Sequence, residues 1–298
     1  MNVFSYSVAL LLGFGTMAGA MPATHAERTQ GRSIVMSRCG IVASEHPLAS
    51  QAGAEILAEG GHAVDAAIAA NAMMGVVAPM TCGLGGDLFA LVYEAKSGKL
   101  DGLNASGYAP SGLTIEHLRQ LGLTNMPQRG IHSVTVPGAV EGWDALRRRF
   151  GRKSFDRLLT PAIRTAREGF PVTELVAGYW AGGERLMRAD PAAAETFLPE
   201  GRAPRAGELF RNPGLEWSLR HIARRGSAAF YRGPIAETLL ATSRRHGGTL
   251  TAADLREYRA EWVEPISTTY RGWTVSEIPP NGQGIAALVM LNLMERFP

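Results

Sequence analysis

The fold is decided by residues 40–110, which read GIVASEHPLASQAGAEILAEGGHAVDAAIAANAMMGVVAPMTCGLGGDLFALVYEAKSGKLDGLNASGYAP. We expect a short strand at 41–43, then a helix that opens near Pro47 and ends at the Gly-Gly pair 60–61. Pro is pre-set for a first helical turn, and Gly tolerates the left-handed conformation that follows a last one. A second helix is predicted over 64–77, where an alanine-rich face lets another layer approach closely.

A glycine-rich turn and a hairpin complete this stretch. The turn CGLGGD at 82–87 is followed by predicted strands at 88–93 and 100–104, joined by Lys-Ser-Gly-Lys. Because the turn leads into a strand rather than a helix, interpretation as a phosphate-cradling loop fails. Asp87 is therefore interpreted as a turn former and Asp65 as a helix cap.

Composition excludes several classes of protein. The chain has 298 residues, 46% of them hydrophobic, which is enough for a substantial core in one or two domains. The 30 basic and 27 acidic residues give a net charge of only +3, and no dense basic run is interleaved with aromatic residues. Nucleic-acid binding is therefore unsupported. The seven histidines show no metal-ligand spacing, so neither a metal nor an organic cofactor is implied.

Residues 1–26 resemble a secretory signal. They contain no Lys, Arg, Asp or Glu, carry a short apolar run, and offer small-x-small cleavage sequences that end at Ala20 and Ala26. We expect a mature chain that lies in the periplasm or outside the cell and has no membrane span. The alternatives are a misplaced start codon or an apolar tail. In an exported protein Cys39 and Cys82 could pair, or they could remain two small apolar residues.

The rest of the chain is mainly helical by its pattern. Helices are predicted at 114–121, 139–150, 155–168, 172–187, 215–225, 234–246 and 285–294. A strand is expected at 132–136, a loop over 189–213, and a strand pair at 264–270 and 273–278. The last helix is apolar on more than one face, and such a helix is usually buried. We therefore expect the chain to be truncated at its C-terminal end; the alternative is a terminal helix packed back on the body.

Motifs spread over the chain resemble the large-subunit region of the gamma-glutamyltranspeptidases. The resemblance covers about 38–295 and places a large-subunit region at 33–298. Each piece is weak alone, but so many in the family's order make a specific signal. The matching pieces are HPLA at 46–49, AGAEIL at 52–57, GGHAVDAA at 60–67, GLGG at 83–86, VPG at 136–138, PAI at 161–163, AREGFPV at 166–172, AFY at 229–231, YRG at 270–272 and PP at 279–280.

This resemblance implies an N-terminal-nucleophile hydrolase with a four-layer αββα sandwich, here incomplete because the small-subunit half is absent. Strands at Ile41, Leu88, Leu100 and Val275 would lie in its central sheets. The family's precursor cleaves itself, and the new amino-terminal Thr of the small subunit is the nucleophile. No catalytic residue is therefore assigned here, and we expect the fragment alone to be inactive. Thr268-Thr269 lacks the His of the family's cleavage site and is interpreted as structural.

The resemblance also places the substrate. The family has an Arg four residues before the Pro of its Ala-Pro, where it holds the alpha-carboxylate of a gamma-glutamyl group. Ser106 occupies that position here, with Asn104 before it and Tyr108 as a pocket wall or a half-buried strand-end aromatic. Ser brings no charge, so gamma-glutamyl binding should weaken, and the Asn-Ala-Ser-Gly form is similar to the acylase-like branch of the family.

Three functions stay open at this point. The first is a gamma-glutamyltranspeptidase-like acyltransferase or amidohydrolase, which passes the acyl group of glutathione-type gamma-glutamyl amides to water or to an amino acid or peptide. The second is a cephalosporin-acylase-like amidohydrolase. The third is a non-catalytic remnant or binding subunit. The expected partners are the small subunit of the same precursor and a small gamma-glutamyl or acyl amide.

Overall fold

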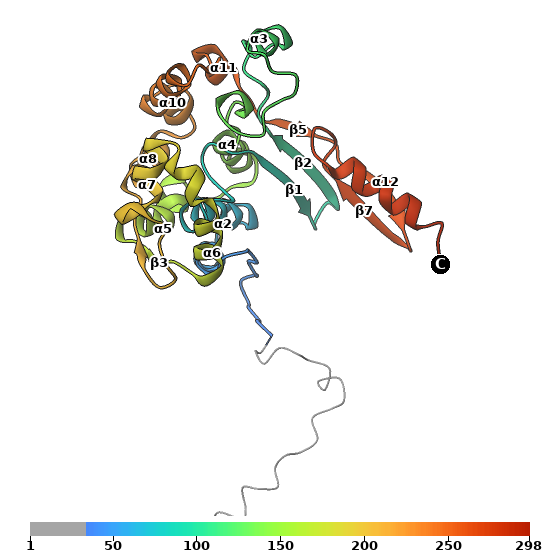
Figure 1. Ribbon diagram of the computed structural model, residues 1–298. Coiled ribbons are helices and arrows are strands. Elements are labelled where there is room, and N and C mark those ends of the chain that lie inside the picture. Colours follow the sequence, from blue (N-terminus) through green and yellow to red (C-terminus); the bar gives the residue numbers. More distant parts are fainter. Residues whose placement is uncertain (1–33) are drawn as a thin grey trace, which may run out of the picture. The chain divides into compact units, whose positions relative to one another are not determined.

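The computed structural model describes residues 34–298 (Figure 1), and residues 39–298 of it form one unit. The predicted export signal at 1–26 lies outside the described residues. Helices are the main regular structure of the described chain, and short antiparallel sheets join them among turns and loops, so the mixed α/β class is confirmed. Within the described residues, no helix is both long and apolar enough to cross a membrane.

The first two helices form as predicted, and histidines cap both. α1 spans Pro47–Ala58 and α2 spans Ala63–Val77, and the two pack against each other. His46 Nδ1 accepts a hydrogen bond from Leu48 N at 3.2 Å, which requires a ring nitrogen without a proton. Burial lowers the pKa of His46, in keeping with that neutral role. Asp65 caps α2 as expected, because Oδ2 accepts from His62 N at 2.8 Å.

The hairpin is also confirmed, and it gains a third strand. β1 (Leu88–Glu94) pairs with β2 (Lys99–Ala105) in an antiparallel register that places Leu91 opposite Gly102. β5 (Glu261–Val263) pairs with the other side of β2, so the strand order is β1-β2-β5 and β1 is an edge. The pattern of β5 was not recognised in the sequence because only three residues pair.

The two faces of this sheet differ. On one face, α4 (Ala139–Phe150) lies close to the hairpin at Gly142, where an added Cβ would stand 2.8 Å from the Ala105 Cβ. On the other face β1 exposes every second side chain: Phe89 is 43% exposed, Leu91 42% and Tyr93 64%. One face of the sheet is therefore packed into the core. On the opposite face, the apolar side chains of β1 are exposed.

Further helices build the body around α2. α5 (Phe155–Glu168) packs between α2 and α8 (Pro213–Arg225). The bounds of α5 are those predicted, and α8 begins two residues before its predicted start. The other elements of the body are α3 (Ile115–Gln120), β3 (Phe170–Pro171), α6 (Glu174–Arg188), α7 (Pro191–Phe197), β4 (Leu209–Phe210), α9 (Ala228–Tyr231), α10 (Pro234–Arg245), α11 (Ala252–Glu257) and the 3₁₀ turns Ile131–Ser133 and Pro199–Gly201.

Three local predictions are wrong. No strand forms at 41–43: Ile41 is 65% exposed, and no other described segment pairs with it. No strand forms at 132–136, where a 3₁₀ turn precedes a single bond from Val136 N to the Tyr108 carbonyl. The expected loop at 189–213 contains α7 and β4, because Asp190 caps a helix that Pro191 opens.

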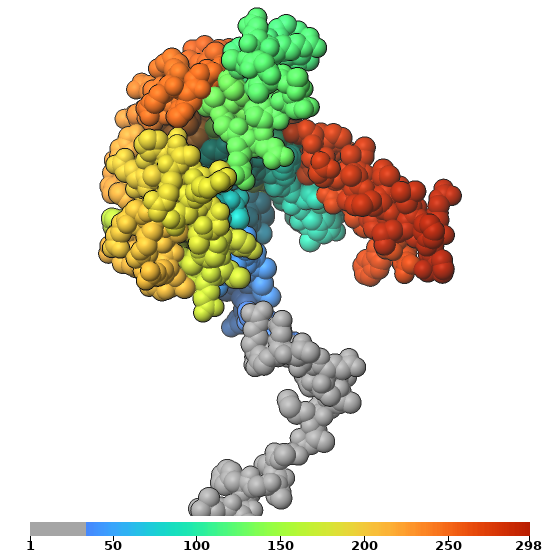
Figure 2. Space-filling view, in the orientation of Figure 1, coloured from blue at the N-terminus to red at the C-terminus, as the bar shows by residue number. Residues whose placement is uncertain are grey.

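The C-terminal segment forms a second hairpin with a helix on it. β6 (Ile266–Tyr270) and β7 (Trp273–Glu277) pair with each other, and α12 (Gly284–Met294) contacts both; Figure 1 draws them in orange and red. Val275, predicted to lie in a strand, does so in β7, which belongs to a two-stranded sheet separate from that of β1. The apolar helix α12 is not buried as a whole, because Leu288 is its only buried residue. Figure 2 shows this C-terminal segment in red at the surface.

Candidate functional site

Ser106 lies just after β2 at the centre of a chain of side-chain hydrogen bonds. Asn104 Nδ2 donates to Asn281 Oδ1 at 3.0 Å, and Asn281 Nδ2 donates to Ser106 Oγ at 3.0 Å. Ser106 Oγ in turn donates to Asp87 Oδ2 at 3.0 Å. We call Asp87, Asn104, Ser106 and Asn281 the Asp87–Ser106 cluster. The three segments that supply it begin or end a strand or a helix, so rigid elements position each one.

Two of the predicted site residues, Ser106 and Asn104, are therefore brought together. Asn104 has a second role, since its Oδ1 accepts from Ser106 N at 2.9 Å and folds the chain into a tight turn at the end of the strand. Both ends of its amide are thus engaged with protein groups. Asn104 positions Ser106 and Asn281 rather than pointing to solvent.

Asp87 and Asn281 belong to the cluster although sequence reasoning did not assign them to it. Asp87 ends the glycine-rich turn that leads into β1, and its Oδ1 accepts from Gly107 N at 3.3 Å. Asn281 lies in the turn before α12. The only signal for Asp87 was a carboxylate in a glycine-rich turn, which turn formation alone explained. Asn281 lies in the sequence PNGQG at 280–284, which resembles the acylase-like branch of the family, but nothing local pointed to its partner Ser106, which is 175 residues away.

Glycines let the backbone close around this cluster. At Gly107 an added Cβ would lie 1.6 Å from the Val136 carbonyl oxygen, and at Gly138 it would lie 1.9 Å from that of Ala105. Gly138 N also donates to the Gly86 carbonyl at 3.0 Å. Only residues without a side chain fit such approaches. The end of β2, the glycine-rich turn and the start of α4 are therefore locked together.

The third predicted residue, Tyr108, stands beside the cluster. Its side chain is 48% exposed, and its ring lies 5.6 Å from that of Tyr258. Partial burial raises the pKa of Tyr108, and the negative charges of Asp254 and Glu257 add to the effect. Within the described residues its hydroxyl makes no hydrogen bond to Ser106. Tyr108 is thus an exposed aromatic surface next to the cluster.

Behind Tyr108 lies a buried tyrosine pair that anchors α4. Tyr231 Oη donates to the Pro137 carbonyl at 2.6 Å and accepts from Glu141 N at 3.2 Å, so it bridges the residues around the start of α4. Burial raises the pKa of both Tyr231 and Tyr258. The Tyr258 hydroxyl is buried and has no hydrogen-bond partner among the described residues.

The electrostatic character of the cluster is negative. Asp87 is exposed and accepts only from a hydroxyl and a backbone N–H, both of them neutral. Within residues 34–298 no Lys, Arg or His forms an ion pair with it. Ser106, at the position where the resemblance implied an Arg, is hydrogen-bonded to the Asp87 carboxylate.

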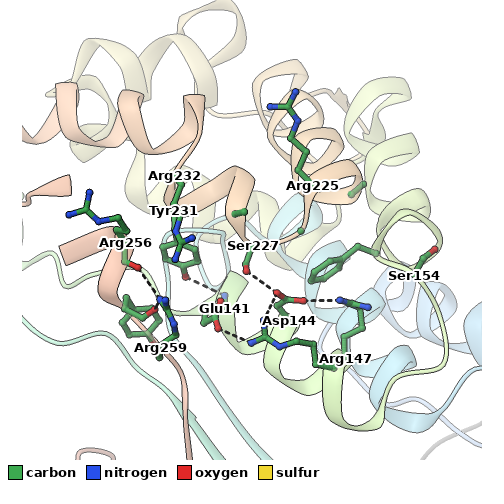
Figure 3. A pocket seen from close by; sticks show the side chains of 16 residues that line it. Glu141, Asp144, Arg147, Ser154, Arg225, Ser227, Tyr231, Arg232, Arg256 and Arg259 are labelled. Carbon is green, nitrogen blue, oxygen red and sulfur yellow. Dashed lines mark hydrogen bonds and ion pairs between the residues drawn. The ribbon is translucent and has the colours of Figure 1, made fainter. Parts of the chain in front are cut away.

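Apart from this cluster, a pocket of about 560 Å³ lies between α4, α8, α9 and α11 (Figure 3). Its two carboxylates are occupied: Arg148 bonds to Glu141 at 2.9 Å and to Asp144 at 2.9 Å. Among the arginines labelled in the figure, Arg147 lies on α4, Arg225 on α8 and Arg256 on α11. The network ties α4 to its neighbours, since Ser227 also donates to Asp144 at 2.8 Å. We assign it a structural role.

No metal site accompanies these features in the described chain, where no three His, Cys, Asp or Glu side chains gather closely enough to hold an ion. Cys82 is a half-buried thiol. The site therefore consists of the Asp87–Ser106 cluster and the aromatic surface of Tyr108.

Comparisons with known proteins identify the family of this chain. The family model described as Gamma-glutamyltranspeptidase matches residues 49–298, so the chain belongs to the gamma-glutamyltranspeptidase family. The glutathione hydrolase-like YwrD proenzyme of Bacillus subtilis is 39% identical over 258 residues, which are 86% of this chain and 49% of that protein. The chain spans about half the length of the curated relatives it matches.

Solved structures agree with this assignment. Helicobacter pylori gamma-glutamyltranspeptidase matches with a TM-score of 0.84 and 30% identity, over 89% of this chain and 77% of that one. The cephalosporin acylase from Bacillus halodurans matches with a TM-score of 0.82 and 44% identity, over 90% of this chain and 52% of that one. These matches confirm the predicted N-terminal-nucleophile fold.

Proposed function

We propose that this chain is the large-subunit region of an amide-cleaving acyltransferase or hydrolase with a weakened preference for gamma-glutamyl donors. The observation that carries this proposal is Ser106 bonded to Asp87, at the position where the family's pattern has an Arg for the alpha-carboxylate. Losing a charged hydrogen bond costs about 1.5–3 kcal/mol, which weakens binding tenfold or more. The similarity to a cephalosporin acylase also supports an acyl donor other than gamma-glutamyl.

The proposed chemistry uses an amino-terminal Thr from a small subunit of the same precursor. Its free alpha-amine takes the proton of its hydroxyl, and the hydroxyl oxygen attacks the amide carbonyl. The acyl group then passes to water or to an acceptor amine. In this proposal the Asp87–Ser106 cluster binds the far end of the acyl group and takes no part in proton transfer. The 298-residue chain alone would neither process itself nor turn over substrate.

The open face of the β1 sheet supports a partner subunit. Phe89, Leu91 and Tyr93 form a continuous apolar row along an edge strand, which is a surface that favours association. We propose that the small subunit covers this row. The proposed location is the periplasm or the medium, and amino-terminal sequencing of the cellular product would test it by finding a start after Ala20 or Ala26.

The test of function expresses the full-length gene and assays hydrolysis of two anilides, gamma-glutamyl and butyryl. The butyryl donor lacks both the alpha-amine and the alpha-carboxylate. We expect self-processing into two polypeptides and turnover of both donors without strong preference for gamma-glutamyl. A strong gamma-glutamyl preference would contradict the proposed specificity. Absence of processing and of any turnover would favour the non-catalytic remnant or binding subunit.

A further inference from the structure

We propose that Asp87 sets the charge of the acyl-donor subsite beside Ser106, so that the site accepts acyl groups with a neutral or cationic far end and rejects those that end in a carboxylate. This inference rests on the proposed function for the location of the subsite. It goes further because it names an electrostatic selector and the class of donor that it selects.

The hydroxyl proton of Ser106 is already engaged in a hydrogen bond. A hydroxyl has one donor hydrogen, and here it is directed to Asp87 Oδ2 at 3.0 Å. Asn281 Nδ2 meanwhile donates to Ser106 Oγ at 3.0 Å. Ser106 therefore cannot donate to a substrate carboxylate unless it gives up the bond to Asp87. The hydroxyl that replaces the family's guanidinium offers an arriving anion no ready donor.

The second step concerns the charge of Asp87. Its two hydrogen-bond donors, the Ser106 hydroxyl and the Gly107 N–H, orient the carboxylate without neutralising it. The carboxylate is exposed, so its field reaches a ligand at Ser106 through partly aqueous surroundings. At a distance of about 4 Å such a field still matters, although water and salt screen it.

The third step compares possible donors. A glutaryl group ends in a carboxylate and would be repelled, whereas a 4-aminobutyryl group ends in an ammonium and would be attracted. A gamma-glutamyl group carries both charges on one carbon, so the two effects partly cancel. A butyryl group is the neutral reference. From the range measured for exposed charge pairs we expect each charged donor to differ from butyryl by about two- to fivefold.

The experiment measures binding as well as turnover, so that it does not depend on catalysis. The enzyme from the full-length gene is titrated with glutaramate, 4-aminobutanamide and butyramide, while the NMR signal of the Gly107 amide is followed. The wild type should bind 4-aminobutanamide more tightly than butyramide, and glutaramate more weakly. Asp87→Asn should bring all three dissociation constants within about twofold. Raising the salt from 20 mM to about 1 M should compress the wild-type differences in the same way.

Asp156→Asn is the matched control, because Asp156 is also exposed but lies on α5, away from the cluster. It should leave the three constants unchanged. Damage to the fold would weaken all ligands together, whereas loss of the selector moves the cationic and anionic ligands in opposite directions. Equal binding of the three amides by the wild type, or no saturable binding, would overturn the inference. Selective binding without turnover of any anilide would instead contradict the proposed function.

Discussion

At the scale of single residues, Asp87 changes what a substitution at Ser106 can achieve. An Arg introduced there would have the Asp87 carboxylate within reach and would pair with it, since Ser106 Oγ already lies 3.0 Å from Asp87 Oδ2. Ser106→Arg alone should therefore raise the gamma-glutamyl preference over butyryl by less than about threefold. Ser106→Arg combined with Asp87→Asn should raise it by tenfold or more, as measured by kcat/KM on the two anilides. Equal gains from the single and the double variant would contradict this coupling.

The two buried tyrosines make a matched pair for a stability measurement. Tyr231→Phe removes a hydroxyl that bridges Pro137 and Glu141, and it should lower the free energy of unfolding by about 1–3 kcal/mol. Tyr258→Phe removes a buried hydroxyl without a partner among the described residues, so it should be neutral or stabilising by up to about 1 kcal/mol. Denaturant titration measures both. A larger loss for Tyr258→Phe would contradict the assignment.

The same tyrosines predict a pH dependence. Burial raises their folded-state pKa above the ordinary value of about 10. The unfolded chain therefore loses these protons first as the pH rises. Their contribution is complete below about pH 10 and is lost progressively above it. Unfolding measured between pH 8 and 11 should show this decline, and the double Phe variant should show a shallower one. An unchanged slope would contradict it.

At the scale of elements, two helical glycines should respond in opposite ways to Ala. Gly142 faces the hairpin, where a Cβ would stand 2.8 Å from the Ala105 Cβ, whereas Gly178 in α6 has nothing within 4 Å. Gly142→Ala should destabilise by about 1–3 kcal/mol because it overpacks α4 against β1 and β2. Gly178→Ala should stabilise by about 0.5–1 kcal/mol through helix propensity alone. Thermal unfolding of both variants checks the pair, and shifts of the same sign would contradict it.

Elements with local signals could be predicted from the sequence, and those that depend on distant partners could not. α4 and α5 were predicted with their bounds, and in the structure Gly151 follows the first helix while Ser154 caps the second. β5 was missed, because it exists only through pairing with β2. At the site, Ser106 was predicted from the resemblance, whereas its bond to Asp87 depends on how the glycine-rich turn folds back.

At the scale of the whole molecule, the open apolar row on β1 predicts association. The 298-residue chain without a partner should be poorly soluble or oligomeric on size-exclusion chromatography, because an edge strand with exposed aromatic residues invites pairing. Phe89→Lys with Leu91→Lys should shift it toward monomer. Leu175→Lys, on the exposed side of α6, is the control and should have no effect. A stable monomer of the unsubstituted chain would contradict the prediction.

The position of Asn281 also has a consequence for the order in which the molecule folds. Its bonds to Asn104 and Ser106 close loops of 177 and 175 residues, whereas the β1–β2 hairpin closes within a few. Contacts that span long separations form slowly, because the chain entropy lost on closure is recovered only when they are made. During synthesis the hairpin can form early, yet the amide that orients Ser106 must wait for residue 281 to leave the ribosome. The proposed acyl-donor subsite is therefore expected to be among the last parts of this chain to form.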